Sequence, residues 1–257
     1  MGGARIAAVL AGATLLVAES SARSEAAEVL GCPSGMVAVE GDYCPTEYIE
    51  QTCLRWLDSV SGKPTRCAEF APTEDTECSR RSTHRRFCID EFEYPNRAGE
   101  RPVVMRTFLQ AEETCRAEGK RLCKDSEWTL ACEGSEHLPY PYGLTRDSNA
   151  CNIDKEHSDP DMDALASFDS AQRDAEVERL YQGEPSGSRA ACVSPFGAFD
   201  MTGNVDEWVV NESNEPYKSG LKGGYWGPVR DRCRPMTRGH APNFRFYQIG
   251  FRCCSSR

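Results

Sequence analysis

Hydrophobic and polar positions alternate in two short stretches near the start of the chain. Residues 34–41 (Ser-Gly-Met-Val-Ala-Val-Glu-Gly) alternate well enough to predict a short β-strand. Residues 86–96 predict a second strand, with Phe87, Ile89 and then Phe92 on its inner face. The stretch at about 42–86 combines cysteines and polar turns with little periodicity, so we expect a disulfide-tied insertion rather than a separate domain.

Two helices are predicted further along. Thr107-Phe-Leu-Gln110 is a capping box, because the Thr hydroxyl can accept from the third helical amide while the Gln side chain reaches back. Phe108, Ala111 and Cys115 then share one face, and Gly119 supplies a stop. Asp125 is the expected N-cap of the second helix.

The second helix carries Trp128, Ala131 and Cys132. Residues 154–187 are polar and predict a loop with at most one weak helix. The remainder consists of short apolar runs separated by Gly, Pro and Asn, which are typical of short strands and turns. These patterns together indicate a disulfide-rich α+β protein, and its 257 residues are enough for one large domain with a real core.

The N-terminus predicts a secretory signal peptide. Arg5 precedes the apolar run Ile6–Ala18, which is too short to span a bilayer, and small residues follow it. We expect cleavage after Ala26, with Ala22 as the alternative, leaving 27–257 as one exported domain in the periplasm or outside the cell. Leu30-Gly-Cys32 is similar to a lipoprotein box, but it lies too far from the apolar run to favour lipidation.

The charge is acidic, with 40 Asp and Glu against 30 Lys and Arg. Nucleic-acid binding depends on basic clusters that neutralise phosphates, and this chain has no basic run, so we expect no nucleic-acid partner. No stretch approaches the roughly 20 apolar residues of a membrane span. Solubility is the simplest role for the charge.

All fourteen cysteines lie beyond the predicted signal peptide. An even number in an exported chain predicts disulfides, up to seven of them. No two cysteines have the C-x-x-C spacing of zinc knuckles, and the four histidines are far apart. A zinc site is therefore not expected.

Four ordered motifs resemble the formylglycine-generating enzyme family, also called sulfatase-modifying factors. They are Gly119-Lys-Arg-Leu-Cys123 leading to Trp128, Phe196-Gly-Ala-Phe-Asp-Met-Thr-Gly-Asn-Val-Asp-Glu-Trp208, Leu221-Lys-Gly-Gly-Tyr-Trp226 and Ile249-Gly-Phe-Arg-Cys253. The resemblance implies a single compact domain with a C-type-lectin-like fold and much irregular backbone. It also implies an oxidase that converts a cysteine of a sulfatase to formylglycine.

The cysteine pair that such oxidases use is missing. The family holds copper(I) between two thiolates spaced C-x-x-x-x-C just after its G-G-S motif, and soft thiolates suit that ion. Here Gly223–Cys233 has no cysteine before Cys233, Tyr225 replaces the Ser, and no two cysteines stand five positions apart. We therefore expect no copper and predict a binding or accessory module, with an active oxidase as the alternative. A different oxidation, with histidine-bound iron from a partner domain, would need a domain for which this chain has no room.

The resemblance also implies disulfides. It pairs Cys115 with Cys253 and Cys132 with Cys233, although Cys233 is offset by about two positions. A lone nucleophile is the alternative role of Cys233. Cys151 with Cys192 is a further candidate pair. Neighbours on a strand point to opposite faces, so Cys253 and Cys254 favour two separate bridges over a vicinal redox pair.

Calcium is the metal that the resemblance implies. One site would use the side chains of Asp200 and Glu207 and the carbonyls of Gly203 and Val205, and a second would use Asn152 and Ile153. Such oxygen ligands suit a hard cation. The alternative is a turn in which Asp200 and Asn204 only bond local amides.

Two other sequence patterns bear on ligands. Asp159–Asp163 starts like an EF-hand, but Ala164 and Ser170 break the pattern, so an acidic loop is expected there. Aromatic residues gather in the C-terminal half, at Tyr140, Tyr142, Tyr225, Trp226, Phe244, Phe246 and Tyr247. The resemblance places a groove for an extended peptide of an exported protein near the glycine pair, and His240 and Arg238 are polar candidates there. Asn211-Glu-Ser213 matches a glycosylation sequon.

Overall fold

The computed structural model describes residues 31–60, 63–64, 66–73 and 78–256. The predicted signal peptide, 1–26, lies outside these residues. Among the residues described, no helix is long and apolar enough to cross a membrane.

The first sheet is built on the two predicted strands. β1 (Met36–Tyr43) pairs antiparallel with β6 (Thr83–Asp90) over its whole length, from Met36 opposite Asp90 to Tyr43 opposite Thr83. β12 (Cys253–Ser255) and β7 (Arg121–Leu122) complete the order β1-β6-β12-β7. Phe87 and Ile89 are buried as predicted, whereas Phe92 lies beyond the end of β6 and stacks on Phe199, with ring centres 5.2 Å apart.

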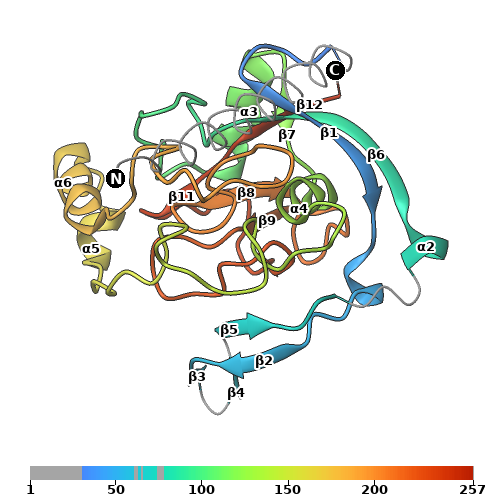
Figure 1. Cartoon of the computed structure of the whole chain (residues 1–257). Coiled ribbons are helices and arrows are strands. Elements are labelled where there is room, and N and C mark those ends of the chain that lie inside the picture. The colour runs from blue at the N-terminus through green and yellow to red at the C-terminus, as the bar shows by residue number, and fades with distance from the viewer. Residues whose placement is uncertain (1–30, 61–62, 65, 74–77, 257) are drawn as a thin grey trace, which may run out of the picture.

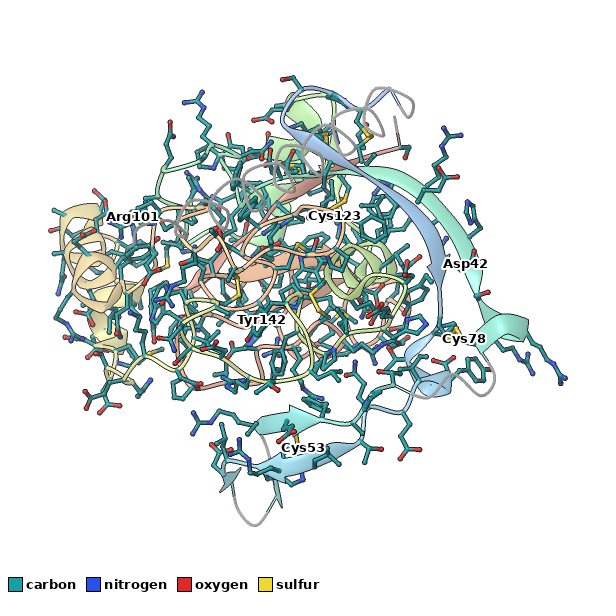
Figure 2. All side chains as sticks on the ribbon, in the orientation of Figure 1. Asp42, Cys53, Cys78, Arg101, Cys123 and Tyr142 are labelled. Carbon is teal, nitrogen blue, oxygen red and sulfur yellow. A yellow bond between two sulfur atoms is a disulfide. The ribbon has the colours of Figure 1, made fainter. Side chains whose placement is uncertain are left out.

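The cysteine-rich stretch is a small ribbon between β1 and β6. It contains η1 (Thr46–Tyr48), β2 (Cys53–Trp56), β3 (Ser59–Val60), β4 (Lys63–Pro64), β5 (Cys67–Phe70) and α2 (Cys78–Arg81). β1 and β6 arch along one side of the molecule toward this ribbon (Figure 1). Disulfides join Cys44 to Cys78 and Cys53 to Cys67 (Figure 2 labels Cys53 and Cys78).

The ribbon also bonds to the body of the domain. The Tyr140 hydroxyl donates to the Cys67 carbonyl at 2.6 Å, and the amide of Phe70 donates to the Leu144 carbonyl at 3.0 Å. The ring of Phe70 packs edge-on against Tyr140. These contacts bury Phe70 and fix the inner strand of the ribbon on the domain.

The first predicted helix is α3 (Phe108–Ala117), and its capping box is confirmed. The amide of Gln110 donates to the Thr107 hydroxyl at 3.1 Å, and the amide of Thr107 donates to the Gln110 side chain at 3.0 Å. Its face of Phe108, Ala111 and Cys115 is fully buried.

The predicted cap of the second helix, α4 (Asp125–Glu133), was wrong by one residue. Lys124 is the N-cap, and its amide donates to Glu127 at 2.9 Å. Asp125 is the first helical residue, and its carboxylate accepts from the amide of Glu212 at 3.2 Å instead of a helix amide. The carboxylate that the sequence offers as a cap therefore ties α4 to a distant loop.

The stretch at 154–187 forms two helices where at most one weak helix was expected. They are α5 (Met162–Ala166), capped by Asp161, and α6 (Ser170–Leu180), capped by Asp169. The two lie together at one side of the molecule (Figure 1). α6 buries only Glu176 and Leu180, so its sequence carries little amphipathic signal, and the aspartate caps define it instead.

The second sheet forms the centre of the domain. Its order is β10-β9-β8-β11, with β8 (Asp206–Val210), β9 (Ser219–Lys222), β10 (Met236–Thr237) and β11 (Ile249–Gly250). Trp128 of α4 and Trp208 of β8 anchor two buried clusters on either side of it. α3 and α4 pack between the two sheets' strands, which confirms the predicted α+β class.

All fourteen cysteines form disulfides. The structure joins Cys115 to Cys253, Cys132 to Cys233 and Cys151 to Cys192, with Cα atoms 5.6, 5.5 and 4.8 Å apart. Cys254 bonds Cys123, so the neighbouring Cys253 and Cys254 hold two different elements. Cys32 bonds Cys88 across the edge of the first sheet.

Candidate functional site at the Gly223–Gly224 turn

The chain turns sharply at Gly223 and Gly224, directly after β9. Both have positive φ, 90° and 79°. A Cβ on Gly223 would lie 2.9 Å from the Met201 carbonyl, and one on Gly224 would lie 2.2 Å from a carboxylate oxygen of Asp231. Only glycine fits both the backbone conformation and these close approaches.

A buried ion network, rather than sulfur, lies behind this turn. Asp231, which is fully buried, pairs with Arg146. Arg146 also donates hydrogen bonds to both oxygens of Asp154, at 2.8 and 2.9 Å. Asp154 in turn forms an ion pair with Arg66 of the cysteine-rich ribbon, at 2.7 Å. Burial raises the pKa of Asp231 to about 8, against the pull of Arg146.

The cysteine that follows the turn is not a thiol. Cys233 is fully buried and bonded to Cys132 of α4. Its amide donates to the Pro139 carbonyl at 2.9 Å. With every cysteine of the chain in a disulfide, the turn faces no thiolate that could bind a soft metal ion or attack a substrate.

Glu207, a predicted calcium ligand, is bound to a cation of the protein itself. The Arg252 side chain approaches its two oxygens through Nε, at 3.0 and 2.8 Å, and through Nη2, at 2.7 Å. The Trp128 indole donates to the same carboxylate at 2.8 Å. These contacts come from three N–H donors, one of which is shared between both oxygens, and the guanidinium already balances the charge of Glu207.

Asp200 and a residue that the sequence did not predict, Glu93, lie on the other side of this cluster. One oxygen of Asp200 accepts from the Gly187 amide at 2.7 Å, and burial raises its pKa to about 6. Glu93 is fully buried, and burial followed by the charges of Asp200 and Glu207 raises its pKa well above the usual range. Its oxygen Oε1 has no hydrogen-bond partner among the described atoms.

The two predicted calcium segments are packed on each other. The amide of Asn204 donates to the Asn152 carbonyl at 2.9 Å, and the Asn152 side chain donates to the Asn204 side chain at 3.1 Å. A Cβ on Gly203 would lie 2.4 Å from both the Asn152 carbonyl and Ile153. Val205 is buried in the core beside them.

Among the residues that the structure describes, no three His, Cys, Asp or Glu side chains are placed together to hold a metal ion, so calcium at this cluster stays a prediction. Arg252 forms its ion pair with Glu207, and among the described atoms one buried side-chain oxygen of Glu93 and one of Asn152 have no hydrogen-bond partner. Unpaired buried oxygens next to excess negative charge are what a hard cation would satisfy. The predicted ligands of both sites, Asp200, Gly203, Val205 and Glu207 in the first and Asn152 and Ile153 in the second, thus lie around one cluster, in which Glu207 is already paired with Arg252.

The aromatic residues of the C-terminal half divide among three places. Tyr140 and Tyr142 stack on each other beneath the cysteine-rich ribbon, and Trp226 and Tyr247 belong to a buried cluster that Tyr225 contacts. Phe244 and Phe246 instead line an open cavity of about 500 Å³ with Met105, Leu165 and His240. The His240 ring stacks on Phe244, with centres 4.1 Å apart.

Two other polar candidates lie elsewhere. Arg238 lines a different cavity, beside Lys222. Asn211 of the sequon is fully buried, and its amide nitrogen donates to the carbonyls of Glu215 and Tyr217 at 3.0 and 2.8 Å. The folded protein therefore does not offer Asn211 to a glycosylating enzyme.

The chain is similar in sequence to several known proteins. A sequence model of the sulfatase-modifying factor enzyme 1-like domain matches residues 46–257. The chain is 28% identical over 177 residues to a Bos taurus protein named inactive C-alpha-formylglycine-generating enzyme 2, an alignment that covers 60% of this chain and 50% of that protein. It is also 28% identical over 173 residues to serine/threonine-protein kinase pkn1 of Chlamydia caviae, over 59% of this chain and 24% of that one.

The crystal structure of CarF has a similar fold. It matches with a TM-score of 0.55 at 15% identity, covering 88% of this chain and 99% of that chain. At this identity the match concerns the fold alone. The chain spans about half the length of the bovine relative and about a quarter of the chlamydial one.

Proposed function

Because the chain belongs to the sulfatase-modifying factor enzyme 1-like domain family and has its C-type-lectin-like fold, we propose that it is an exported binding or accessory module and not an oxidase. Its scaffold would present a ligand face, and its disulfides would hold that face rigid. We therefore assign the family's fold to this chain without its oxidase activity, since a fold does not by itself fix a function.

The observation that carries this proposal is the state of the cysteines. Cys233 is bonded to Cys132, and the glycine turn faces the Asp231–Arg146 pair where two thiolates would be needed. A guanidinium beside a buried carboxylate offers nothing to copper(I), which prefers sulfur. The bovine relative is itself named as an inactive enzyme, which supports a member of this family without the oxidation chemistry.

The open cavity beside His240 and Phe244 supports the binding role. Its volume of about 500 Å³ is in the range of ligand sites, and its rim includes Met162 and Tyr217, which are 58% and 39% exposed. Arg245 adds a cation to this mostly apolar lining. We expect an extended segment of an exported protein to bind there, with an aromatic or aliphatic side chain inserted against Phe244.

Seven disulfides support export, since such bonds persist in oxidising compartments. Calcium is the remaining part of the proposal. Asp200 and Asn152 would hold the ion, which would supply structural charge balance to the buried carboxylates and no chemistry.

A turnover assay tests the proposal. The secreted protein is supplied with copper(I), oxygen and a peptide containing C-x-P-x-R, and oxygen consumption and the mass of the peptide cysteine are followed. We expect no turnover above a blank without protein. In parallel, alkylation under denaturing conditions without reductant should label no cysteine. Turnover, or two labelled cysteines, would overturn the proposal.

A further inference from the structure

A second cavity, of about 370 Å³, opens where the cysteine-rich ribbon meets α4 and the segment that follows the glycine turn. Tyr43, Thr46 and Gln51 line it from the ribbon side, and Asp125 and Thr129 line it from α4. Four basic side chains also line it, namely Lys222, Arg232, Arg234 and Arg238. In a chain of formal net charge −10, so many cations around one cavity stand out against the average surface.

Arg232 has no carboxylate partner in the described part of the chain. Its guanidinium carbon lies 5.2 Å from the ring centre of Phe70, a contact with the ring face that leaves the N–H edge available. The buried Nε of Arg232 has no hydrogen-bond partner among the described atoms. Burial, together with the charges of Arg146 and Arg230, lowers the pKa of Arg232. Partial burial of a guanidinium carries a desolvation cost, and no described carboxylate offsets that cost for Arg232.

Lys222 is a buried amine on the same lining. It is 2% exposed, and its Nζ donates to the hydroxyl of Thr129 at 2.7 Å and to the carbonyl of Arg234 at 2.9 Å. Both hydrogen-bond partners are neutral, and the Nζ also lies 5.4 Å from the ring centre of Trp128; an ammonium has three donors, so one is left beyond the two hydrogen bonds.

The other charges do not balance these two. Arg234 is already paired, because its Nη2 donates to Glu133 at 2.6 Å. Asp125 is the carboxylate on the lining, and it accepts from the amide of Glu212. With Arg234 paired to Glu133, the described lining holds Arg232, Arg238 and, when it is protonated, Lys222 against the one carboxylate of Asp125.

We propose that this cavity binds a small oxyanion, a phosphate, sulfate or carboxylate group, with Arg232 and Lys222 as its direct ligands. The guanidinium edge of Arg232 suits the two oxygens of such a group, and Lys222 adds a point charge from below. The hydroxyls of Tyr43 and Thr46 would complete the shell as neutral donors. At about 370 Å³ the cavity has room for a small molecule that carries the anion as well as for the bare ion.

The site is independent of the proposed peptide-binding face. The cavity beside His240 and Phe244 has none of its lining residues in common with this one. A failure of either proposal therefore leaves the other standing.

Isothermal titration of the full exported chain tests the site, with sodium phosphate, sulfate and acetate as separate probes against chloride of equal ionic strength. Arg232→Gln removes the unpaired guanidinium, Lys222→Met removes the amine, and Arg97→Gln, an exposed arginine paired with Glu100, is the control. We expect binding of at least one oxyanion that weakens about tenfold or more in Arg232→Gln and is unchanged in Arg97→Gln.

Thermal unfolding in chloride separates ligand binding from a structural role. Because no carboxylate of the described residues pairs with Arg232, Arg232→Gln should unfold at the same temperature as the parent or higher, and only the rise in midpoint caused by the oxyanion should disappear. Lys222→Met could fail to fold, in which case the Arg232→Gln comparison decides. No heat with any of the three anions beyond chloride, or equal affinity in Arg232→Gln, would overturn the proposal.

Discussion

Arg252 holds the carboxylate of Glu207 through its Nε and Nη2 in a place that solvent does not reach, with the two side chains 0% and 1% exposed. The remaining Nη contacts of Arg252 go to the carbonyls of Asp90, Glu91 and Phe199, so the same side chain links the first sheet to the loop before β8. Both residues belong to motifs that identify the family. Their pairing therefore fixes the first sheet against the loop before β8 and needs no ligand to do so.

Removing one partner should be costly. Arg252→Gln leaves the carboxylate of Glu207 buried beside Asp200 and Glu93, and breaking a buried pair in this way costs about 3–5 kcal/mol. Urea unfolding followed by tryptophan fluorescence measures the loss. The exposed pair of Arg97 and Glu100 is the matched control, and Arg97→Gln should change stability by less than about 1 kcal/mol. Equal effects at the two sites would contradict the role given to Arg252.

The disulfides should differ in what they contribute. Cys115 and Cys253 are 138 residues apart in sequence, and Cys53 and Cys67 only 14. In the chain-entropy model, the disulfide that closes the long loop stabilises the folded protein by about 4–5 kcal/mol, and the one that closes the short loop by about 3 kcal/mol. We expect the double variant Cys115→Ala and Cys253→Ala to lose cooperative unfolding of the domain. The double variant Cys53→Ala and Cys67→Ala should loosen only the ribbon, as amide hydrogen exchange of the two variants would show.

Much of the fold could be predicted from sequence because its signals are local. The alternation at 34–41 gave β1, and Thr107 with Gln110 gave the start of α3. The ordered motifs indicated the family. The helices at 162–180 were underestimated because α6 is nearly all exposed, so no apolar period marks it.

The charges of the site could not be predicted, because they depend on residues distant in sequence. Glu93 is bonded by Ser186 and Asn204, which follow it by 93 and 111 positions. The pattern of residues 86–96 predicts a strand, but it does not show that Glu93 is buried beside Asp200. Likewise, Glu207 was assigned to calcium because its own motif suggests an oxygen site, and only the fold brings Arg252 to it.

Calcium should stabilise the protein if Asp200 and Asn152 hold it. The unfolding midpoint in excess calcium should rise relative to the same protein in chelator, as mass action requires for any ligand of the native state. Asp200→Asn should remove that rise, whereas Asp42→Asn, which changes an exposed aspartate next to His84, should not. Differential scanning calorimetry measures these midpoints. No rise in the parent protein would count against calcium.

Lys222 should make stability depend on pH in the alkaline range. Burial lowers its pKa to about 7; Asp125 and Glu133 of α4 oppose this shift, while Arg234 and Arg230 reinforce it. An unfolded lysine keeps its proton up to about pH 10.4, so between these values the unfolded state binds more protons than the folded state. The contribution of Lys222 to the free energy of unfolding therefore rises with pH from about 7 toward 10, and it does not change with pH below 7.

The difference between the parent and Lys222→Met isolates this effect from the other titrating groups. Between pH 7 and pH 9.5 the parent should gain about 2–3 kcal/mol relative to the variant in urea unfolding. Adding an oxyanion that the parent binds should reduce the gain, because a bound negative charge favours the ammonium and raises its pKa. A parallel pH course in parent and variant would mean that Lys222 stays charged in the folded protein, with Asp125 and Glu133 outweighing its burial.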